Sequence, residues 1–284
     1  MADVEESMAS KGGRNSTLFE RKFMTRLDIE LINKKIFETR SQAQNEIKNG
    51  IVYVNGKKIT KNSYETKEND IIEIRGETLK YVSRGGLKLE KALNEFNISL
   101  KNKTMLDIGS STGGFTDCAL QKNIKEVIDI DVGSNQLAEK IRTNPKVKVF
   151  EQCDIRNFEN DILNNIDIIT IDISFISITK ILEKIESINN AKEVICLIKP
   201  QFECGKEMAD KYKGIILNKE IHKNIIKRII ESFSKINYYL NGLTFSPIKG
   251  GNGNIEYLAY FTKTKVNNAV NINKLVEDTF NKLK

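Results

Sequence analysis

Residues 105–117 read MLDIGSSTGGFTD, and this stretch decides the fold that the sequence predicts. A short apolar lead-in ends at Asp107, small residues run from Gly109 to Gly114, and a sequence compatible with a helix follows from Phe115. A strand, a tight glycine turn and a helix N-terminus open a nucleotide-binding βαβ unit. The glycines let a ligand approach the backbone, and the first helical turn offers free N–H groups.

Three kinds of ligand compete for this turn. A phosphate-cradling loop needs Gly-Lys-Ser/Thr at its end, and the turn contains no lysine. A dinucleotide fingerprint needs G-x-G-x-x-G, but Ser111 stands where the second glycine belongs. S-adenosylmethionine brings no pyrophosphate to the backbone, so its turn tolerates small polar residues. The missing phosphate features therefore favour S-adenosylmethionine as the cofactor.

An acid at the end of the following strand suits either adenosine cofactor. Residues 125–130 are predicted to form that strand, and we prefer Asp131 over Asp129 as the residue that holds the ribose hydroxyls. The expected cofactor site consists of the turn and of acids at neighbouring strand ends. Its members are Asp107, Gly109, Ser110, Ser111, Thr112, Gly113, Gly114, Phe115, Asp131 and Asp172.

The same turn also spells G-x-S-x-G, the nucleophile elbow of hydrolases. The chain order Ser111, Asp172, His222 would suit a catalytic triad. However, His222 is the only histidine, and it lies in a run (218–233) whose apolar spacing predicts an amphipathic helix. We expect it to be a surface or boundary residue, so the hydrolase is the less favoured interpretation.

The composition limits the class of protein. A chain of 284 residues accommodates one large domain and a small one. No apolar run has membrane-spanning length, and the acidic, polar N-terminus is unlike a signal peptide. The four cysteines lack metal-ligand spacing, so we predict no metal site and expect buried thiols in a reducing cytoplasm. The net charge of +7 is compatible with a nucleic-acid partner.

Residues 24–80 are predicted to form a small α+β unit. Apolar spacing indicates a first helix over 27–36, and a second helix over 42–48 stops at Asn49-Gly50. A strand over 51–54 enters the hairpin turn Asn55-Gly56 and returns over 57–59, and a strand over 70–74 closes the unit. Residues 1–23 show no periodicity, and we interpret them as a disordered tail or an added extension.

Strands and helices alternate in residues 81–284. Predicted strands cover 103–108, 125–130, 147–150, 166–171 and 193–198, which indicates a mostly parallel sheet with helices on both faces. A final pair of strands, near 238–245 and 255–261, surrounds the glycine-rich loop 249–253 and suits a reversed last strand. The prediction is an α/β, Rossmann-like domain with a seven-stranded sheet, joined by a short connector to the small unit.

Polar residues collect at the strand ends, where open parallel sheets bind ligands. Asp172 ends the fourth strand, Lys199 ends the fifth, and Glu256 begins the last strand. Lys88 lies just inside the start of a helix predicted from Gly85. A lysine at the end of a buried strand needs partners, so we expect these four residues to face a cleft. Salt bridges at the rim of the sheet are the alternative.

Methyl transfer to a ribose 2′-hydroxyl would use such a set. The sulfonium methyl is already a good electrophile, so the protein must align the reactants and remove a weakly acidic proton. A lysine can take that proton where a second ammonium and desolvation favour its neutral form. Amine methylation would more naturally use an Asn/Asp-Pro-Pro-Tyr loop, and base C5 methylation a Pro-Cys nucleophile. Neither motif is present.

The pattern RLD…ETRSQAQNEIKNGIVYVNGKKITK in residues 26–61 resembles the S4-type RNA-binding domain. The resemblance implies that a two-helix face and the following hairpin hold structured RNA, although a solvated helix face is the alternative for each single lysine. The basic residues that fall where such contacts would be made, with one from the second domain, are Arg26, Lys34, Lys35, Arg40, Lys48, Lys57, Lys58 and Arg84.

Residues 24–284 resemble the TlyA family, an S4-type domain fused to an FtsJ-like Rossmann methyltransferase. The matching stretches are SRGGLKLEKAL, LDIGSSTGGFTDCALQ, DVGSNQL, DISFISI, LIKPQFE and KGGNGNIEYL. The resemblance implies 2′-O-methylation of cytidine in ribosomal RNA, of the large and in some members also the small subunit. It places the Lys-Asp-Lys-Glu catalytic tetrad on Lys88, Asp172, Lys199 and Glu256.

Further expectations come with this resemblance. Asp154 is expected to contact the adenine, although relatives commonly carry Asn there. The family also carries the label haemolysin, but nothing in the sequence supports a pore, so a membrane-active protein is a weaker alternative. A catalytically silent ribosome-assembly factor is the other. We expect a cytoplasmic monomer whose partner is ribosomal RNA or a ribosomal subunit.

Overall fold

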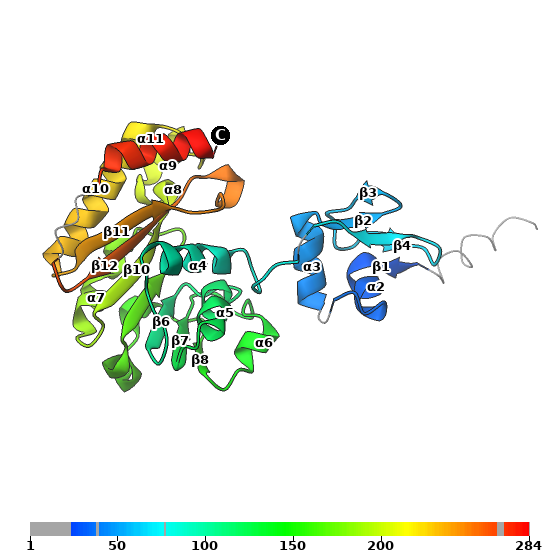
Figure 1. Cartoon of the computed structure of the whole chain (residues 1–284), viewed down its shortest axis with the longest axis horizontal. Coiled ribbons are helices and arrows are strands. Elements are labelled where there is room, and N and C mark those ends of the chain that lie inside the picture. Colours follow the sequence, from blue (N-terminus) through cyan, green and yellow to red (C-terminus); the bar gives the residue numbers. More distant parts are fainter. Residues whose placement is uncertain (1–23, 38–39, 77, 266–269, 284) are drawn as a thin grey trace, which may run out of the picture. The chain divides into compact units, whose positions relative to one another are not determined.

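The computed structural model describes residues 24–37, 40–76, 78–265 and 270–283 (Figure 1). The predicted tail, residues 1–23, lies outside the described residues. The chain divides into two compact units, one ending at Leu79 and the other beginning at Lys80. Each unit has its own apolar core.

The first unit packs two helices against short antiparallel strands. Its elements are β1 (Thr25–Arg26), α2 (Leu27–Asn33), α3 (Arg40–Asn49), β2 (Val52–Val54), β3 (Lys57–Lys58), β4 (Glu65–Thr66) and β5 (Ile72–Ile74). The strands form one sheet in the order β3-β2-β5 and a separate β1-β4 pair. The predicted hairpin turn is present, because Asn55 and Gly56 both have positive φ, as such a two-residue turn requires. The first helix is shorter than predicted and ends at Asn33.

The second unit contains a seven-stranded sheet in the order β11-β12-β10-β9-β6-β7-β8. Its strands are β6 (Thr104–Ile108), β7 (Glu126–Ile130), β8 (Val147–Phe150), β9 (Ile168–Ile171), β10 (Glu193–Ile198), β11 (Tyr239–Phe245) and β12 (Tyr257–Thr262). The first five are parallel to one another, whereas β12 is antiparallel to both of its neighbours. The predicted Rossmann-like α/β fold with a reversed last strand is therefore confirmed.

Helices cover both faces of this sheet (Figure 1). The helices are α4 (Gly85–Glu95), α5 (Gly114–Gln121), α6 (Glu139–Arg142), α7 (Leu182–Ser187), α8 (Pro200–Glu203), α9 (Lys206–Lys211), α10 (Lys219–Lys235) and α11 (Ile272–Lys282). One core cluster holds side chains of α4 and α5, and the other holds side chains of α7, α10 and α11. The sequence predicts this arrangement, because its strands alternate with helices and are mostly apolar. A strand that is covered on both faces has no polar side.

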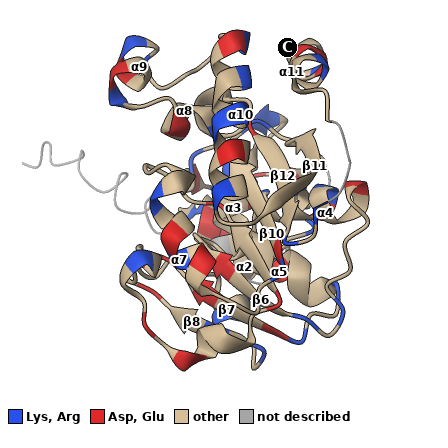
Figure 2. Ribbon diagram, turned by 90° about the vertical axis from the view of Figure 1, so that its left-hand side faces the viewer, with Lys and Arg blue, Asp and Glu red and all other residues tan. Residues whose placement is uncertain are grey.

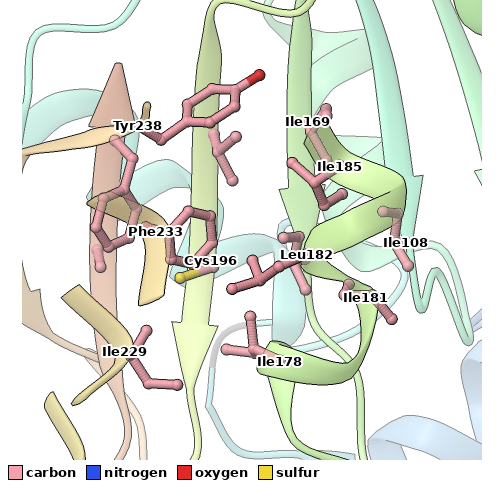
Figure 3. Packing of buried hydrophobic residues seen from close by; sticks show 14 of the residues in the cluster. Ile108, Ile169, Ile178, Ile181, Leu182, Ile185, Cys196, Ile229, Phe233 and Tyr238 are labelled. Carbon is pink, nitrogen blue, oxygen red and sulfur yellow. The ribbon is translucent and has the colours of Figure 1, made fainter. Parts of the chain in front are cut away.

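The larger core cluster is built mostly from isoleucines. Figure 3 shows Ile229 and Phe233 of α10 on one side of Cys196 of β10, and Ile178 and Leu182 on the other side. Cys118 and Cys196 are fully buried, as expected, whereas Cys153 and Cys204 are only half-buried because they lie in loops beyond strand and helix ends. All four thiols are free.

Candidate active site

A cavity of about 890 Å³ opens in the second unit, at the carboxyl ends of β6, β9 and β10. The glycine turn after β6 forms one wall, the starts of α4 and α5 another, and the glycine-rich loop before β12 a third. All four members of the expected catalytic set line this cavity: Lys88, Asp172, Lys199 and Glu256.

The turn after β6 brings the backbone close to the cavity. Gly109 has a φ of 85°, and a Cβ atom there would lie 2.8 Å from the carbonyl oxygen of Asp172. Only glycine therefore lets the ends of β6 and β9 approach one another. Gly113 also has positive φ and precedes the first residue of α5. The first turn of α5 thus faces the cavity with N–H groups that have no intrahelical partner.

Helix α4 begins against the start of α5. A Cβ atom on Gly114 would lie 2.3 Å from Ser83 Oγ and 2.9 Å from the backbone nitrogen of Gly86. The motif Ser83-Arg84-Gly85-Gly86 and the turn glycines therefore belong to one close contact between two helix N-termini. This contact places Lys88, in the first turn of α4, against the cavity.

Asp131 is held beside the turn by backbone amides. The Ser111 N–H donates to Asp131 Oδ2 at 2.8 Å, and the Gly133 N–H donates to Oδ1 at 2.6 Å. Each carboxylate oxygen has a second lone pair that a ribose hydroxyl could use. Together with the turn, this donor and acceptor set fits an adenosine group, and no lysine of a phosphate loop is present.

Asp107 and Asp129 lie beneath the turn rather than in the cavity. Asp107 is fully buried and accepts hydrogen bonds from Thr170 and Thr116, each at 2.8 Å. The hydroxyl of Thr116 is also 2.6 Å from Asp129 Oδ1. Burial raises the pKa of Asp107 to about 7, and burial with the neighbouring Asp107 charge raises the pKa of Asp129 well above its ordinary value. One hydroxyl hydrogen cannot serve both carboxyls, so a protonated carboxyl completes the contact.

Asp154, the expected adenine contact, does not line the cavity. Its carboxylate accepts from the backbone and the guanidinium of Arg156, each at 3.0 Å. The Arg156 side chain accordingly holds the pKa of Asp154 below its ordinary value.

The four expected catalytic residues form two ion pairs. Lys88 Nζ lies 2.7 Å from Glu256 Oε2, and Lys199 Nζ lies 2.6 Å from Asp172 Oδ1. Lys199 also donates to Ser174 Oγ at 2.9 Å. The register of the sheet produces this arrangement, because the antiparallel partner of Ile198 is Tyr257, which sets the residue after β10 opposite the residue before β12. Both pairs are mostly buried.

Two polar residues of α8 were not assigned from the sequence: Gln201, which lines the cavity, and Glu203, which does not. Gln201, in α8, donates from Nε2 to Glu256 Oε1 at 3.2 Å. Glu203 is buried and accepts from Ser177 Oγ at 2.6 Å and from the Ile178 N–H at 2.7 Å, which ties α8 to the segment after β9. Both residues lie in the stretch KPQFE, residues 199–203. Their closeness to Lys199 in the sequence was the feature that could have marked them as site residues.

An aromatic residue stands at the mouth of the cavity. Phe175 is 88% exposed and has a φ of 69°, which is unusual for a residue with a side chain. Its ring lies 5.2 Å from that of Phe202, at a tilt of 51°. Both residues line the cavity, so an apolar surface borders the lysine–carboxylate pairs.

The structure excludes the hydrolase triad and corrects the expectation for His222. This residue is fully buried, not at the surface or a boundary. Its Nε2 lies 2.8 Å from the carbonyl oxygen of Ile216 and must donate, so Nδ1, 2.9 Å from the hydroxyl of Tyr257, accepts. Both ring nitrogens therefore have structural partners, one in β12 and one in the segment before α10. The histidine is buried because it lies on the apolar face of α10. Ser111 is exposed at the cavity and has no histidine beside it.

The expected RNA-binding residues fall into two groups. Arg26 and Arg40 both bind the buried carboxylate of Asp28, at 3.0 and 2.9 Å. Burial alone would raise the pKa of Asp28, but hydrogen bonds from these arginines and Gln44 hold it well below its ordinary value. The other members of the first unit are exposed lysines in the segment after α2, on α3 and on β3: Lys34, Lys35, Lys48, Lys57 and Lys58. Arg84 is exposed and lines the cavity of the second unit.

Charge alone does not mark an RNA surface on the second unit. Figure 2 shows Lys and Arg interspersed with Asp and Glu along α9 and α10. Within the described residues, no group of three or more His, Cys, Asp or Glu side chains is arranged to hold a metal ion. No helix in the described part of the chain is both long and apolar enough to cross a membrane.

The strand order and the cavity at the strand ends define a Rossmann-like methyltransferase fold. The FtsJ-like methyltransferase family matches residues 81–263, and the S4 domain matches residues 25–72. The chain belongs to the FtsJ-like methyltransferase family and carries an S4 domain.

Relatives of similar length share both parts. The chain is 45% identical to Hemolysin A of Brachyspira hyodysenteriae over 83% of this chain and 99% of the relative. It is 36% identical to the 23S rRNA (cytidine-2′-O)-methyltransferase TlyA of Campylobacter jejuni, over 82% and 97%. A solved structure from Streptococcus thermophilus, assigned as a hemolysin, is 37% identical with a TM-score of 0.71, over 91% and 96%. The predicted resemblance to TlyA is confirmed.

Proposed function

We propose that this protein transfers the methyl group of S-adenosylmethionine to the 2′-hydroxyl of a cytidine in ribosomal RNA. The observation that carries the proposal is the pair of lysine–carboxylate contacts in one cavity beside the glycine turn. The name of the Campylobacter relative supplies the acceptor, a ribosomal cytidine, and the S4 domain supplies a means of holding RNA.

Residues of the turn and Asp131 would hold the cofactor. S-adenosylmethionine supplies a methyl group that is activated by a sulfonium. The N–H groups at the start of α5 suit a carboxylate, since a helix N-terminus carries partial positive charge. Asp131, fixed by two backbone N–H groups, suits ribose hydroxyls. Asp107 supports the turn from below through Thr116 and does not reach the cavity.

Lys199 is proposed as the group that receives the proton of the acceptor hydroxyl. Asp172 and Ser174 hold its nitrogen in one position, and a fixed position is what aligned proton transfer requires. Lys88 and Glu256 keep a second ammonium and carboxylate in the same cavity. An ammonium there stabilises negative charge that develops on the acceptor oxygen.

We propose that the chain works as two domains, with a boundary near residue 80. The first would bind structured RNA through its exposed lysines, and Arg26 and Arg40 would contribute from their fixed positions around Asp28. Arg84, at the cavity, would contact RNA near the reacting nucleotide. Hemolysin is a family label for relatives, so we place this protein in the cytoplasm with the ribosome and expect a monomer, which light scattering after gel filtration checks.

The test is transfer of labelled methyl from S-adenosylmethionine to each unmodified ribosomal subunit. We expect label in 2′-O-methylcytidine after digestion of the RNA. Cofactor binding without label in either subunit would point to another RNA or a missing partner. No cofactor binding would overturn the proposal.

A further inference from the structure

We propose that Gln201 recognises the exocyclic amine of the target cytosine and so sets the base specificity of the reaction. The proposal rests on the proposed function and deepens it. Gln201 follows Lys199 by two residues, lies in α8 and lines the cavity, with 9% of its surface exposed. A polar side chain that is this deeply buried at a cavity wall needs a partner for each of its polar atoms.

The orientation of the Gln201 carboxamide follows from its neighbour. Gln201 lies 3.2 Å from Glu256 Oε1, and a carboxylate only accepts hydrogen bonds. The end of the carboxamide that faces Glu256 must therefore be the amino group, Nε2. The oxygen, Oε1, is left as a fixed acceptor at the cavity wall.

This acceptor has no partner among the residues that the structure describes. Gln201 Oε1 is buried and makes no hydrogen bond. The other cavity-lining atom in the same situation, Asp172 Oδ1, lies 2.6 Å from the ammonium of Lys199 and so has a compensating charge. Within the described residues, Gln201 Oε1 accepts no hydrogen bond from a Lys or Arg side chain. A buried acceptor without a donor is costly, so a donor on the substrate fits this position.

Glu256 makes the Gln201 position rigid. Its other oxygen is bound to Lys88 at 2.7 Å. A Cβ atom on Gly250 would lie 2.1 Å from Glu256 Oε1, so the glycine-rich loop packs directly on this carboxylate. The Gln201 oxygen therefore cannot swing away to find another donor without breaking the contact with Glu256.

The chemistry of a nucleotide within an RNA strand leaves few donors. Cytidine in a strand has only two: the 2′-hydroxyl and the N4 amine. In the proposed reaction Lys199 receives the single proton of the 2′-hydroxyl. The N4 amine of the cytosine is therefore the donor that remains for Gln201. Uridine presents a carbonyl oxygen at the same place, which would face Gln201 Oε1 lone pair to lone pair. A site built to accept a hydrogen bond rejects an analogue that lacks the donor.

The experiment compares rRNA fragments that carry cytidine, uridine or the pyrimidin-2-one ribonucleoside, which has only hydrogen at C4, at the methylated position. That position is located first by the labelled-methyl assay. For the wild type we expect kcat/KM to fall about 10- to 100-fold when the amine is absent, as for one buried hydrogen bond. For Gln201→Leu we expect a loss of the same size, about 10- to 100-fold, on cytidine only, so that the three fragments become nearly equal. The same substitution outside the cavity, Gln121→Leu, should preserve the cytidine preference.

Each other outcome would overturn the proposal. Equal losses on all three fragments would mean that Gln201 only positions Glu256, and a weaker cofactor affinity in calorimetry would assign its oxygen to the cofactor. A wild type that does not distinguish the fragments would exclude base readout, whatever the variant does. Should Gln201→Leu fail to fold, Gln201→Met and the wild-type comparison decide. A wild type that methylates no cytidine at all would instead contradict the proposed function.

Discussion

Two parts of the site, the glycine turn and the lysine-lined wall of the cavity, neutralise their carboxylates in different ways. Beneath the glycine turn, Asp107 and Asp129 share the hydroxyl of Thr116, and neither has a Lys or Arg partner among the ion pairs of the described residues. Asp172, just after β9, and Glu256, just before β12, each hold a lysine ammonium.

The difference shows that the partner, not the residue type, decides what a buried acid does. A carboxyl group that keeps its proton is neutral, so it adds little to the electric field in the site and acts only through its hydrogen bonds. A carboxylate paired with an ammonium keeps two charges in place and holds a nitrogen at a defined point. We therefore expect the turn side to govern stability and cofactor affinity, and the lysine side to govern the chemical step.

The largest effect is expected from Lys199→Ala. A positioned general base contributes about 10²- to 10⁴-fold, so kcat should fall by about 10³ while cofactor affinity stays within a few-fold. Labelled-methyl kinetics and calorimetry measure the two quantities. The matched control is Lys192→Ala, an exposed lysine just before the same strand, which should leave both unchanged. A kcat within tenfold of the wild type would move the base elsewhere.

The second prediction concerns the buried pair of Lys88 and Glu256. Removing one partner leaves an uncompensated buried charge, so Lys88→Met and Glu256→Gln should each lower the free energy of unfolding by about 3 kcal/mol. The double variant should cost less than the sum of the two. Calorimetric unfolding of the wild type, the two single variants and the double variant measures the interaction energy of the pair. The surface pair Lys148–Glu126 is the control, with an expected cost below about 1 kcal/mol. Additive losses at the buried pair would show that the two charges do not interact.

Much of the fold follows from local sequence. The apolar strands, the Asn55-Gly56 hairpin and the turn at Gly109–Gly114 each have a short-range signal, and the structure has all of them. The pair β1–β4 has no such signal, because two residues per strand are too few to show a period. The burial of His222 was predicted wrongly. An amphipathic pattern does not show how much of the apolar face of α10 is covered by β12 and by α11.

The site, like the fold, could be predicted from the sequence only in part. The sequence places acids and lysines at strand ends, but it does not pair them. Lys88 and Glu256 are 168 residues apart, and their contact depends on the register of β10 with β12 and on the close approach of α4 to α5. Gln201 could not be assigned for the same reason, because its role depends on which end of its carboxamide faces Glu256.

The third prediction tests the turn side through the cofactor. Asp131→Ala removes the proposed ribose acceptor and frees the N–H groups of Ser111 and Gly133, so the Kd for S-adenosylmethionine should rise about 10- to 100-fold. Calorimetric titration gives the value. Asp154→Ala is the comparison: its carboxylate is already engaged by Arg156, so we expect only about a fivefold change. A larger effect at Asp154 than at Asp131 would reverse the assignment.

The smallest effect is a pH dependence from the acids under the turn. Burial raises the pKa of Asp107 to about 7, so this carboxyl stays protonated in the folded protein at a pH where the unfolded chain ionises. The stability that it contributes is therefore complete at low pH and is lost as the pH rises to about 7. His222 acts in the opposite sense, because burial lowers its pKa and the unfolded chain binds the proton first. Because the two effects oppose one another, the expected pH dependence is that of the Tm difference between a variant and the wild type.

Asp129→Asn removes one of the two neighbouring acids beneath the turn and leaves His222 unchanged. The Tm of this variant, measured relative to the wild type, should rise between pH 5 and pH 7.5 by a few degrees, since about 1 kcal/mol corresponds to roughly 2–4 °C in a domain of this size. The exposed Asp161→Asn should show no such trend. A Tm difference for Asp129→Asn that does not change with pH would mean that Asp107 and Asp129 hold no proton in the folded protein, and two negative charges without a Lys or Arg partner would then lie beneath the turn.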